Sequence, residues 1–358
     1  MATKKILELC LSPDLGGLEL YMVRASHSLK TISVINKNGK LESYYQNTDY
    51  PYFKIGRLDI LKLSQIIDEN DIDVVHLHWT KDIPIAVLAK LLSRKKPKLV
   101  QTRNMTMTRF KDDFYHRFLY KNMDRMLAVT QQVKEQIEKF VPADIRPKIE
   151  VLYMGAEQPP IISTEEKKIR REQLGLANSF TVGIVGRIEP EKGQYILIDT
   201  IEKLIHRGID ARALVVGHAM NKEYLEVLQK DIVIRGLKER IIFTGFTREA
   251  QILMQLCDVM VLATKNETFG LVLIEAMMCG VCVIASDSGG PLEIIENEVN
   301  GLHFKTFDRD DLADKLEILE RDGEKRSTFA HAGQQKAREV FESTKQFQKL
   351  TNLLEEDM

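Results

Sequence analysis

One stretch in the second half of the chain constrains the fold more than any other. Residues 259–264 form an apolar, β-branched run of strand length. Residues 271–278 are apolar without alternation and end near Gly280, which predicts a short buried helix with a glycine stop. Residues 281–285 return to strand character. A strand, a loop, a helix and a strand in this order predict one unit of a parallel α/β sheet.

Two acidic residues in this stretch mark a candidate binding site. Glu267 follows the first strand, at the edge where open α/β sheets bind their ligands. The helix begins just after Gly270, and its free N–H groups and dipole favour a phosphate. Glu275 lies roughly 8 Å further along the helix axis, where it would meet the hydroxyls of a ribose. The alternative is structural, with Glu275 a core carboxylate paired with an arginine and Glu267 a helix cap.

The spacing of these residues resembles the signature of a known enzyme family. The motif consists of Glu267, Phe269-Gly270, Glu275-Ala276-Met277, Gly280, Gly289-Gly290 and Glu293. It is similar to that of the retaining nucleotide-sugar glycosyltransferases of family 4, in the glycogen-synthase-like superfamily. The resemblance implies the GT-B fold, which is an α/β architecture of two Rossmann-like, doubly wound domains facing each other across a cleft.

The length of 358 residues suits two domains. We expect an acceptor-binding N-terminal domain over residues 1–160 and a nucleotide-sugar-binding domain over residues 161–340. The resemblance implies that the last helix, in residues 341–358, crosses back to the first domain. The charged run Ser163–Glu172 is interpreted as part of the linker.

Composition excludes several classes of function. The net charge of −1 gives no general attraction to nucleic acid. No apolar run is long enough to cross a membrane, and the four cysteines show no metal or disulfide spacing. We therefore expect a cytoplasmic protein, with a peripheral position on the inner face of the membrane as a further interpretation.

The first domain begins with a strand, a glycine pair and a helix. Residues 5–11 are the strand, and Gly16-Gly17 precede the helical pattern. A dinucleotide-binding G-x-G-x-x-G spacing is missing, which argues against a Rossmann dehydrogenase. The resemblance implies that Gly16 and Gly17 lie against the donor phosphates and the reacting sugar. The alternative is a tight turn with no ligand.

Polar residues at the ends of later strands are candidates for the acceptor side. His76 and His78 have strand spacing and share a face, but no carboxylate or third ligand lies at suitable spacing, so we expect no metal. A core histidine is the preferred role for one of them. Arg103 stands where related enzymes often have a histidine near the sugar, and Asn104 follows it. A fixed positive charge cannot act as a base, but it would hold an anionic acceptor. His78, Arg103 and Asn104 are therefore the acceptor-side candidates.

A basic segment of the first domain carries aromatic residues at helical spacing. Phe110, Phe114, Phe118 and Leu119 fall beside several lysines and arginines. A peripheral membrane contact is one interpretation. A stripe that faces the core, beneath a solvated basic face, is the interpretation that the sequence favours.

The second domain opens with two cations suited to a diphosphate. Residues 180–185 form an apolar strand that ends in Gly186-Arg187, and Lys192 follows at a helix start. These two cations would neutralise a leaving diphosphate without a metal. The alternative is a pair of ordinary surface charges. The resemblance assigns the diphosphate role to Arg187 and Lys192, and it places the donor base against the loop that contains Phe246.

The resemblance and the residues together predict a metal-independent retaining glycosyltransferase of the hexosyltransferase type. It would move a sugar from a nucleoside-diphosphate sugar to a hydroxyl of a saccharide or lipid-linked acceptor, in the synthesis of cell-surface polysaccharide, lipopolysaccharide or glycolipid. No cofactor is expected. The catalytic residues would be Glu267, Arg187 and Lys192. The donor-binding set is Gly16, Gly17, Gly186, Arg187, Lys192, Phe246, Glu267, Phe269, Gly270, Leu271, Val272 and Glu275.

Two alternatives remain open at this point. One is a sugar-nucleotide epimerase or phosphorylase on the same fold, and the other is a non-catalytic GT-B scaffold that binds a nucleotide. The front-face mechanism proposed for the family, in which the leaving phosphate receives the acceptor proton, fits the lack of an obvious base. The sequence does not name the sugar, the base, the acceptor or the oligomeric state.

Overall fold

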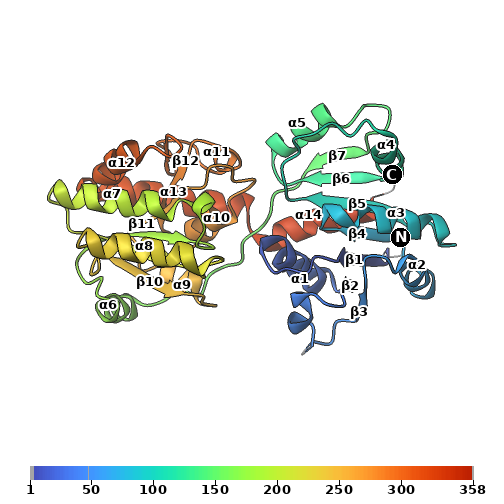
Figure 1. Cartoon of the computed structure of the whole chain (residues 1–358), viewed down its shortest axis with the longest axis horizontal. Helices are drawn as coiled ribbons and strands as arrows, with labels where there is room; N and C mark the ends of the chain where they lie inside the picture. Colours follow the sequence, from blue (N-terminus) through green and yellow to red (C-terminus); the bar gives the residue numbers. More distant parts are fainter. Residues whose placement is uncertain (1–3, 47, 357–358) are drawn as a thin grey trace. The chain divides into compact units, whose positions relative to one another are not determined.

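The computed structural model describes residues 4–46 and 48–356, and the chain divides into two compact units (Figure 1). Unit 1 comprises Met1–Met154 and Ser343–Met358, and unit 2 comprises Gly155–Glu342. The chain therefore leaves unit 1 once and returns to it for its last helix. The boundary after residue 154 comes six residues before the boundary expected from the sequence.

Unit 1 is a parallel sheet with helices between its strands. In the part of the chain that the structure describes, its strands are β1 (Ile6–Cys10), β2 (Ile32–Asn36), β3 (Tyr52–Ile55), β4 (Val74–Leu77), β5 (Lys98–Arg103), β6 (Arg125–Ala128) and β7 (Lys148–Val151). Its helices are α1 (Gly17–Leu29), η1 (Lys40–Tyr44), α2 (Ile60–Glu69), η2 (Thr80–Asp82), α3 (Ile83–Leu92), α4 (Phe114–Lys121), α5 (Gln131–Phe140) and α14 (Ser343–Glu355). The sequence missed β3, in which only Ile55 is buried, while Tyr52 and Phe53 are partly buried and Lys54 is exposed.

Unit 2 repeats this architecture with a smaller sheet. Among the described residues its strands are β8 (Phe180–Val185), β9 (Ala211–Val216), β10 (Ile241–Gly245), β11 (Val259–Leu262), β12 (Cys282–Ser286) and β13 (Leu302–Phe304). Its helices are α6 (Thr164–Gln173), η3 (Pro190–Lys192), α7 (Gln194–His206), α8 (Lys222–Ile234), α9 (Ala250–Met254), α10 (Leu271–Met278), α11 (Pro291–Ile294), α12 (Arg309–Arg321) and α13 (Gly323–Val340).

The interpretation of Ser163–Glu172 as linker was wrong, because this run forms α6. The Ser163 side chain accepts a hydrogen bond from the Glu166 N–H at 3.1 Å and so caps the helix. Acidic residues occupy the first turn and arginines the last, which suits the helix dipole. The helix has no buried residue, so its sequence lacks the apolar period on which the prediction depended.

Both sheets reverse their strand order beside the first strand. The order is β3-β2-β1-β4-β5-β6-β7 in unit 1 and β10-β9-β8-β11-β12-β13 in unit 2, and neighbouring strands are parallel. The loops after β1 and β4 therefore leave toward opposite faces, and so do those after β8 and β11. In open α/β sheets the carboxyl edge at such a reversal is where ligands bind.

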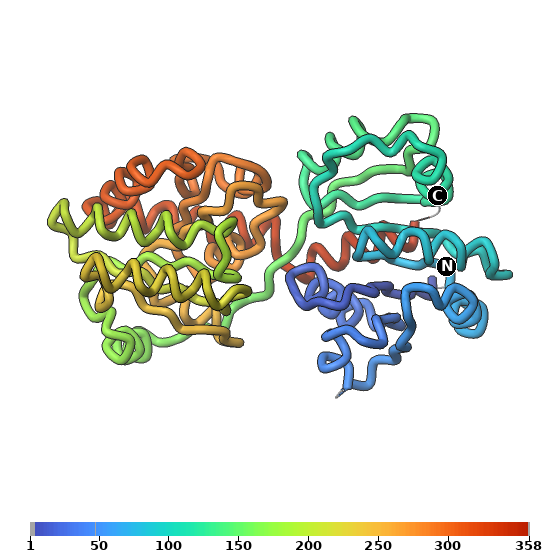
Figure 2. The backbone as a smooth tube through the Cα atoms, in the orientation of Figure 1, coloured from blue at the N-terminus to red at the C-terminus, as the bar shows by residue number. Residues whose placement is uncertain are grey.

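The last helix completes the core of unit 1. Phe347, Leu350 and Leu354 of α14 are buried, and Figure 2 shows this C-terminal segment, in red, running through unit 1. Arg125 of β6 is fully buried and donates hydrogen bonds to the Leu353 carbonyl and to the Glu356 carboxylate. A buried guanidinium with these partners fixes the end of the chain against the sheet.

The aromatic residues around α4 do not form the core-facing stripe that the sequence favoured. Phe110, Phe114 and Phe118 expose 65%, 89% and 38% of their surface, while Leu119 is buried. The helix is only about two turns long, and its buried residues, Leu119 and Tyr120, both lie near its end, so the phenylalanine rings stay outside.

Loss of the α14 contact should destabilise unit 1. We expect Leu350→Ala to lower its free energy of unfolding by about 2–5 kcal/mol, because the substitution leaves a cavity in a packed core. The single tryptophan, Trp79, lies in unit 1, so its fluorescence during urea unfolding reports on this unit. Lys349→Ala, at an exposed position of the same helix, is the control. Equal midpoints for the two variants would contradict the prediction.

Candidate active site

The strand reversal in unit 2 is spanned by an ion pair. Lys192 ends η3, which follows β8, and Glu267 lies in the loop that follows β11. Lys192 Nζ lies 3.1 Å from Glu267 Oε2, and both side chains are about three-quarters buried. The structure thus brings together two predicted catalytic residues that are 75 positions apart in the sequence.

The loop that carries Glu267 is held in place by the glycine pair of the motif. The Gly290 N–H donates to the Glu267 carbonyl at 2.9 Å. A Cβ atom at Gly289 would lie 2.1 Å from that carbonyl oxygen, and one at Gly290 would lie 2.4 Å from the Phe269 carbonyl oxygen. Both positions therefore require glycine, and the loop that they hold leads directly into α10.

The start of α10 presents backbone donors beside the ion pair. Gly270 is the N-cap, with a φ of +103°, and it supplies no side-chain cap. The N–H groups of Leu271 and Val272 lie in the first turn of the helix, where backbone N–H groups find no acceptor within the helix. Both residues are partly exposed. Phe269 is buried and packs edge-to-face against Phe341 within unit 2. An anion would meet both the helix dipole and the Lys192 ammonium here.

The remaining predicted donor residues of unit 2 differ in their exposure and in their partners. Gly186 adopts a φ of +154°, and Arg187 is half exposed, with its guanidinium 3.0 Å from Glu189 Oε1. Arg187 therefore pairs with its own loop rather than with Glu267. Phe246 is 68% exposed at the end of β10, edge-on to the His218 ring. Glu275 is partly exposed on α10, so the buried carboxylate expected from the sequence is in fact accessible.

The glycine pair of unit 1 lies at the corresponding strand reversal of that unit. Gly16 is the extended N-cap of α1, and no atom lies within 4 Å of a Cβ built at Gly17. Close by, the Leu11 N–H donates to Asp82 Oδ2 at 2.8 Å, which links the loops after β1 and β4. Burial raises the pKa of Asp82 to about 7. Because the space beside Gly17 is open, packing does not require a glycine at this position.

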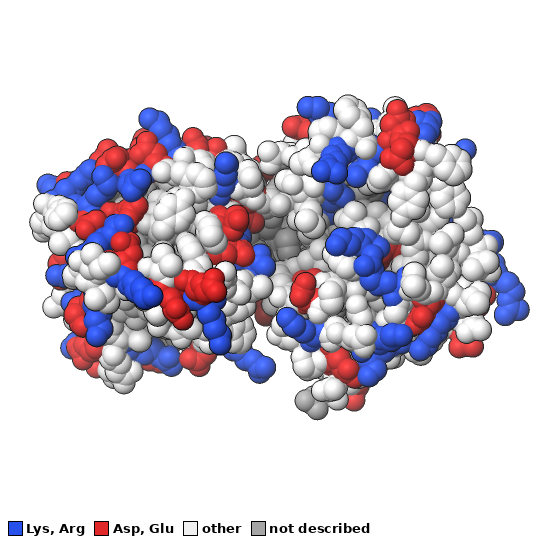
Figure 3. Space-filling view, viewed as in Figure 1, with Lys and Arg blue, Asp and Glu red and all other residues white. Residues whose placement is uncertain are grey.

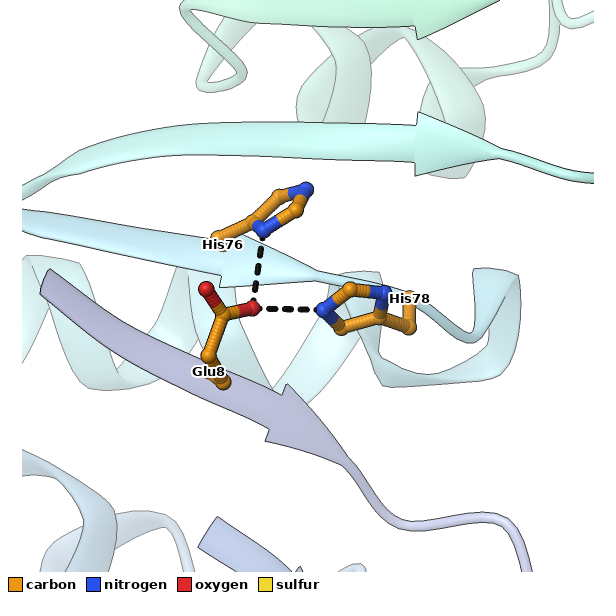
Figure 4. Close-up of side chains that lie close together, drawn as sticks. All are labelled: Glu8, His76 and His78. Atoms are coloured by element: carbon orange, nitrogen blue, oxygen red, sulfur yellow. Dashed lines mark hydrogen bonds and ion pairs between the residues drawn. The ribbon is translucent and has the colours of Figure 1, made fainter. Parts of the chain in front are cut away.

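His76 and His78 form a buried cluster with an acidic residue of the neighbouring strand. Figure 4 shows the Glu8 carboxylate of β1 between the two rings of the β4 end. His78 Nε2 lies 2.6 Å and His76 Nδ1 lies 2.8 Å from Glu8 Oε2. His76 Nε2 lies 2.7 Å from Thr102 Oγ1 on β5. All three members of the cluster are inside the core, so His78, an acceptor-side candidate, is not exposed to a ligand.

The sequence argument that no carboxylate accompanies the histidines was wrong. Glu8 comes from a strand 68 positions earlier, and only the parallel pairing of β1 with β4 brings it there. The three side chains are close enough to be a candidate metal site. However, ligand atoms about 2.1 Å from a tetrahedral metal lie about 3.4 Å apart, whereas these lie at hydrogen-bond distance. As placed, Glu8 is hydrogen-bonded to His78 and lies within ion-pair distance of His76, and the expectation of a metal-free protein stays a prediction.

The cluster has perturbed acid–base properties. Burial acts to raise the pKa of Glu8, but its interactions with His76 and His78 outweigh burial and lower that pKa to about 2. Burial, and then the nearby His76, lower the pKa of His78 from 6.5 to about 4 against the opposing effect of Glu8. His78 is thus neutral in the folded protein at neutral pH.

The other two acceptor-side candidates lie at the end of β5. Arg103 is 6% exposed and donates to the Thr106 carbonyl at 2.9 Å. Asn104 is partly exposed, yet both polar atoms of its amide are buried without a partner among the described residues. Both side chains therefore keep unused hydrogen-bonding capacity.

Sequence reasoning missed several residues at these edges. Glu8 could have been found, because an acid in the middle of the apolar run Ile6–Cys10 is unusual for a central strand. Arg57 and Lys81 gave no such signal, because isolated cations in polar loops are common. His218 likewise stands alone in its segment.

Comparisons with known proteins identify the family. The chain matches the family model for "Glycosyl transferases group 1" over residues 165–336 and that for "Glycosyl transferase 4-like" over residues 8–133. It is 25% identical over 343 residues to an uncharacterized glycosyltransferase of Methanocaldococcus jannaschii, covering 90% of each chain. It is also 25% identical over 312 residues to the N-acetyl-alpha-D-glucosaminyl L-malate synthase of Bacillus anthracis, covering 84% of this chain and 78% of that one.

Solved structures have the same fold. Anabaena Alr3699/HepE in complex with UDP has a TM-score of 0.87 and 25% identity, covering 98% of this chain and 99% of that one. Sucrose-phosphate synthase from Thermosynechococcus elongatus has a TM-score of 0.78 at 17% identity, with 98% of both chains covered, and shows the fold alone. The chain belongs to the family 4 glycosyltransferases, and its two Rossmann-like units have the GT-B fold. The family and the fold predicted from the sequence are confirmed.

The buried cluster should make unit 1 sensitive to acid. The unfolded chain binds a proton at His78 near pH 6.5, whereas the folded protein binds it only near pH 4. Stability from this residue is therefore complete above pH 6.5 and is lost as the pH falls toward 4, by up to about 3 kcal/mol. Glu8 acts in the same direction below its unfolded pKa of 4.5.

Urea unfolding followed by Trp79 fluorescence between pH 7.5 and 4.5 measures this effect. We expect His78→Asn to lose less stability than the parent protein as the pH falls from 6.5 to 4.5. Asp82 opposes His78 in both proteins, because its raised pKa of about 7 stabilises the folded unit as the pH falls. His331→Asn, at an exposed position of unit 2, should follow the parent protein. Equal pH dependence in His78→Asn and the parent protein would rule out the protonation model.

Proposed function

We propose that this glycosyltransferase transfers a sugar from a nucleoside-diphosphate sugar to an acceptor hydroxyl with retention of anomeric configuration and without a metal. The observation that carries the proposal is the Lys192–Glu267 pair beside the start of α10. A cation and a helix N-terminus at one strand reversal suit a diphosphate, and a carboxylate beside them suits the hydroxyls of the donor sugar. The Anabaena structures contain UDP and, in one case, UDP with glucose, which supports a nucleotide-sugar donor.

Each residue has a role in this proposal. Lys192 and Arg187 stabilise the departing diphosphate together with the N–H groups of Leu271 and Val272. Glu267 positions the sugar hydroxyls, and Glu275 accepts hydrogen bonds from the ribose. The bond between the anomeric carbon and the leaving phosphate breaks while the acceptor oxygen bonds to the same face. The leaving phosphate oxygen takes the acceptor proton, so no protein base is needed.

The expected acceptor is a saccharide or a lipid-linked molecule that carries negative charge. Support comes from Arg103 at the β5 end and from the names of relatives. One relative is the N-acetyl-alpha-D-glucosaminyl L-malate synthase of Bacillus anthracis. Another is a D-inositol 3-phosphate glycosyltransferase of Mycobacteroides abscessus, 31% identical over 207 residues. Lipopolysaccharide core mannosyltransferases are also among the relatives, which supports a role in cell-surface glycoconjugate synthesis.

A peripheral membrane contact is part of the proposal. None of the helices in residues 4–46 and 48–356 has the length and apolar character of a membrane span. Exposed apolar side chains nevertheless gather on α2, α3 and α4 of unit 1, where Figure 3 shows a broad uncharged area: Leu58, Leu61, Leu88, Leu91, Leu92, Phe110, Phe114, Tyr115 and Phe118. Basic residues such as Arg109 and Lys121 border it, which suits an anionic lipid surface.

The donor site is tested by ligand-dependent thermal stability and by turnover. We expect one of UDP, GDP and ADP, at a hundredfold its dissociation constant, to add about 2.7 kcal/mol of stability. This gain should survive EDTA and vanish in Lys192→Ala, and transfer should fall at least about 100-fold in that variant. Lys238→Ala, at an exposed lysine of unit 2, is the control. The product should keep the anomeric configuration of the donor by NMR.

Three results would contradict parts of this proposal. Loss of activity in EDTA that magnesium restores would rule out a metal-free mechanism. An epimerised or phosphorolysed donor would favour the other enzymes of this fold. Nucleotide binding without turnover on any acceptor would favour a scaffold.

The membrane contact has a separate test. We expect the double substitution of Phe114→Ser and Phe118→Ser to reduce cosedimentation with vesicles of anionic phospholipid at least tenfold, because burying one such ring contributes about 1.5–3 kcal/mol. Both rings are exposed, so the fold should be unaffected. Ile234→Ser, at a residue of unit 2 that is 84% exposed, is the matched control. Equal binding by the two variants would exclude this surface.

A further inference from the structure

Unit 1 contains a basic cavity at the carboxyl ends of β4 and β5. Its volume is about 240 Å³. The basic side chains along its wall are Arg57, Lys81, Arg103, Lys111 and His116, and two tyrosines, Tyr115 and Tyr120, also line it. No aspartate or glutamate is part of this wall in the described chain. In Figure 3, Lys and Arg side chains cluster over the region of unit 1 where Figure 1 labels β4 and α3.

Arg103 is a buried cation with no counter-ion among the described residues. There its guanidinium has only neutral partners: the Thr106 carbonyl at 2.9 Å and Thr80 Oγ1 at 3.4 Å. Its Nε is buried with no hydrogen-bond partner in residues 4–46 and 48–356. Burial lowers the pKa of Arg103, which measures the cost of holding the charge there. A buried charge of this kind normally has an anionic partner.

The other cations of the wall add to this unpaired charge. Within the described chain, no carboxylate lies within 4.0 Å of Arg57, Lys81, Arg103 or Lys111. Burial, and then the nearby Arg103, lower the pKa of Lys111, while Asp113 opposes this. Asp113 itself pairs with His116. Repulsion between Lys111 and Arg103 would be relieved by an anion that contacts both.

Two cations that line the cavity, Arg57 and Lys81, both contact the Trp79 ring. Arg57 Cζ and Lys81 Nζ lie 5.0 Å and 5.1 Å from the centroid of the Trp79 ring. Such contacts hold a cation in place without neutralising it. Both cations are otherwise exposed, so their charges remain available to a ligand.

We propose that this cavity binds a phosphate group of the acceptor substrate, with Arg103 at its base and Arg57, Lys81 and Lys111 around it. The inference rests on the proposed transfer function, whose acceptor it makes more specific. The guanidinium fork matches the geometry of phosphate oxygens, and its unpaired N–H groups supply the donors. A cavity of this size accommodates a phosphate and part of the group attached to it.

The phosphate can belong to a soluble molecule or to a lipid. Tyr115 both lines the cavity and is 53% exposed on α4, so the cavity adjoins the apolar surface of unit 1. A lipid-linked phosphate would reach the cavity from that surface, whereas a sugar phosphate would enter from solution. The recognition chemistry is the same in both cases.

The test measures phosphate binding with the donor site disabled. All proteins carry Lys192→Ala, so that phosphate does not occupy the diphosphate site. Calorimetry with glycerol 3-phosphate, and with glycerol as the neutral probe, gives the soluble arm. Vesicles that contain phosphatidic acid, compared with phosphatidylcholine alone, give the lipid arm. We expect binding of the phosphate-bearing probe in at least one arm and no binding of glycerol.

Two substitutions assign the binding to the cavity. Arg103→Gln and Lys81→Gln should each weaken it at least tenfold, because each removes a hydrogen bond to a charged group. Lys139→Gln, at an exposed lysine of the same unit, should leave it unchanged. Without phosphate, Arg103→Gln should be at least as stable as the parent protein, because it removes an unpaired buried charge. A purely structural arginine would instead lose stability.

The outcomes separate this inference from the proposed function. UDP binding by the Arg103→Gln protein with Lys192 intact should be normal, because the donor site lies in unit 2. If the nucleotide binds but phosphate binding is absent, or is unaffected by Arg103→Gln and Lys81→Gln, the cavity has another role and this inference fails alone. If no nucleotide binds to any variant, the proposed function fails as well.

Discussion

Parallel strand pairing is the constraint on which the rest of the structure depends. Because neighbouring strands run in the same direction, all their carboxyl ends meet at one edge, and each connection must cross the sheet as a helix. The strand order turns between β1 and β4 and between β8 and β11. At each of these two reversals of strand order the loops diverge, and polar groups meet there. Lys192 pairs with Glu267 in unit 2, and the Asp82 carboxylate accepts the Leu11 N–H in unit 1.

The two units manage charge in opposite ways. In unit 2, the cations of the candidate donor site have carboxylate partners: Lys192 pairs with Glu267, and Arg187 pairs with Glu189. A bound diphosphate would have to displace the Glu267 carboxylate from the Lys192 ammonium or share the ammonium with it. In unit 1, Arg103 lies in the core with neutral partners, while the nearby Glu8 carboxylate is taken up by His76 and His78. A ligand anion would therefore complete the charge balance of unit 1, whereas in unit 2 it would rearrange an existing pair.

Apolar patterns predicted the elements well where one face or both faces of an element are buried. The runs for β8 and β11 and the helix from Leu271 to Met278 are found close to their expected bounds. The pattern failed where burial is slight. Helix α6 has no buried residue and was taken for linker, and the exposed rings of α4 were taken for a core stripe because their spacing alone cannot tell which face meets the core. The order of strand, loop and helix predicted the Glu267 loop, and the structure adds the reason for the glycine pair, since a Cβ at Gly289 or Gly290 would clash with the backbone of this loop.

The sequence by itself determined the family and the GT-B fold, because the motif that resembles the family depends on local spacing around a strand, a loop and a helix. The donor-binding role of the named residues stays a prediction. Tertiary structure decided which distant residues meet. Only strand pairing places Glu8 beside His76 and His78, and only the packing of the loops after β4 and β5 leaves Arg103 buried with no carboxylate partner among the described residues. Such contacts depend on register and crossover geometry, which no short stretch of sequence contains.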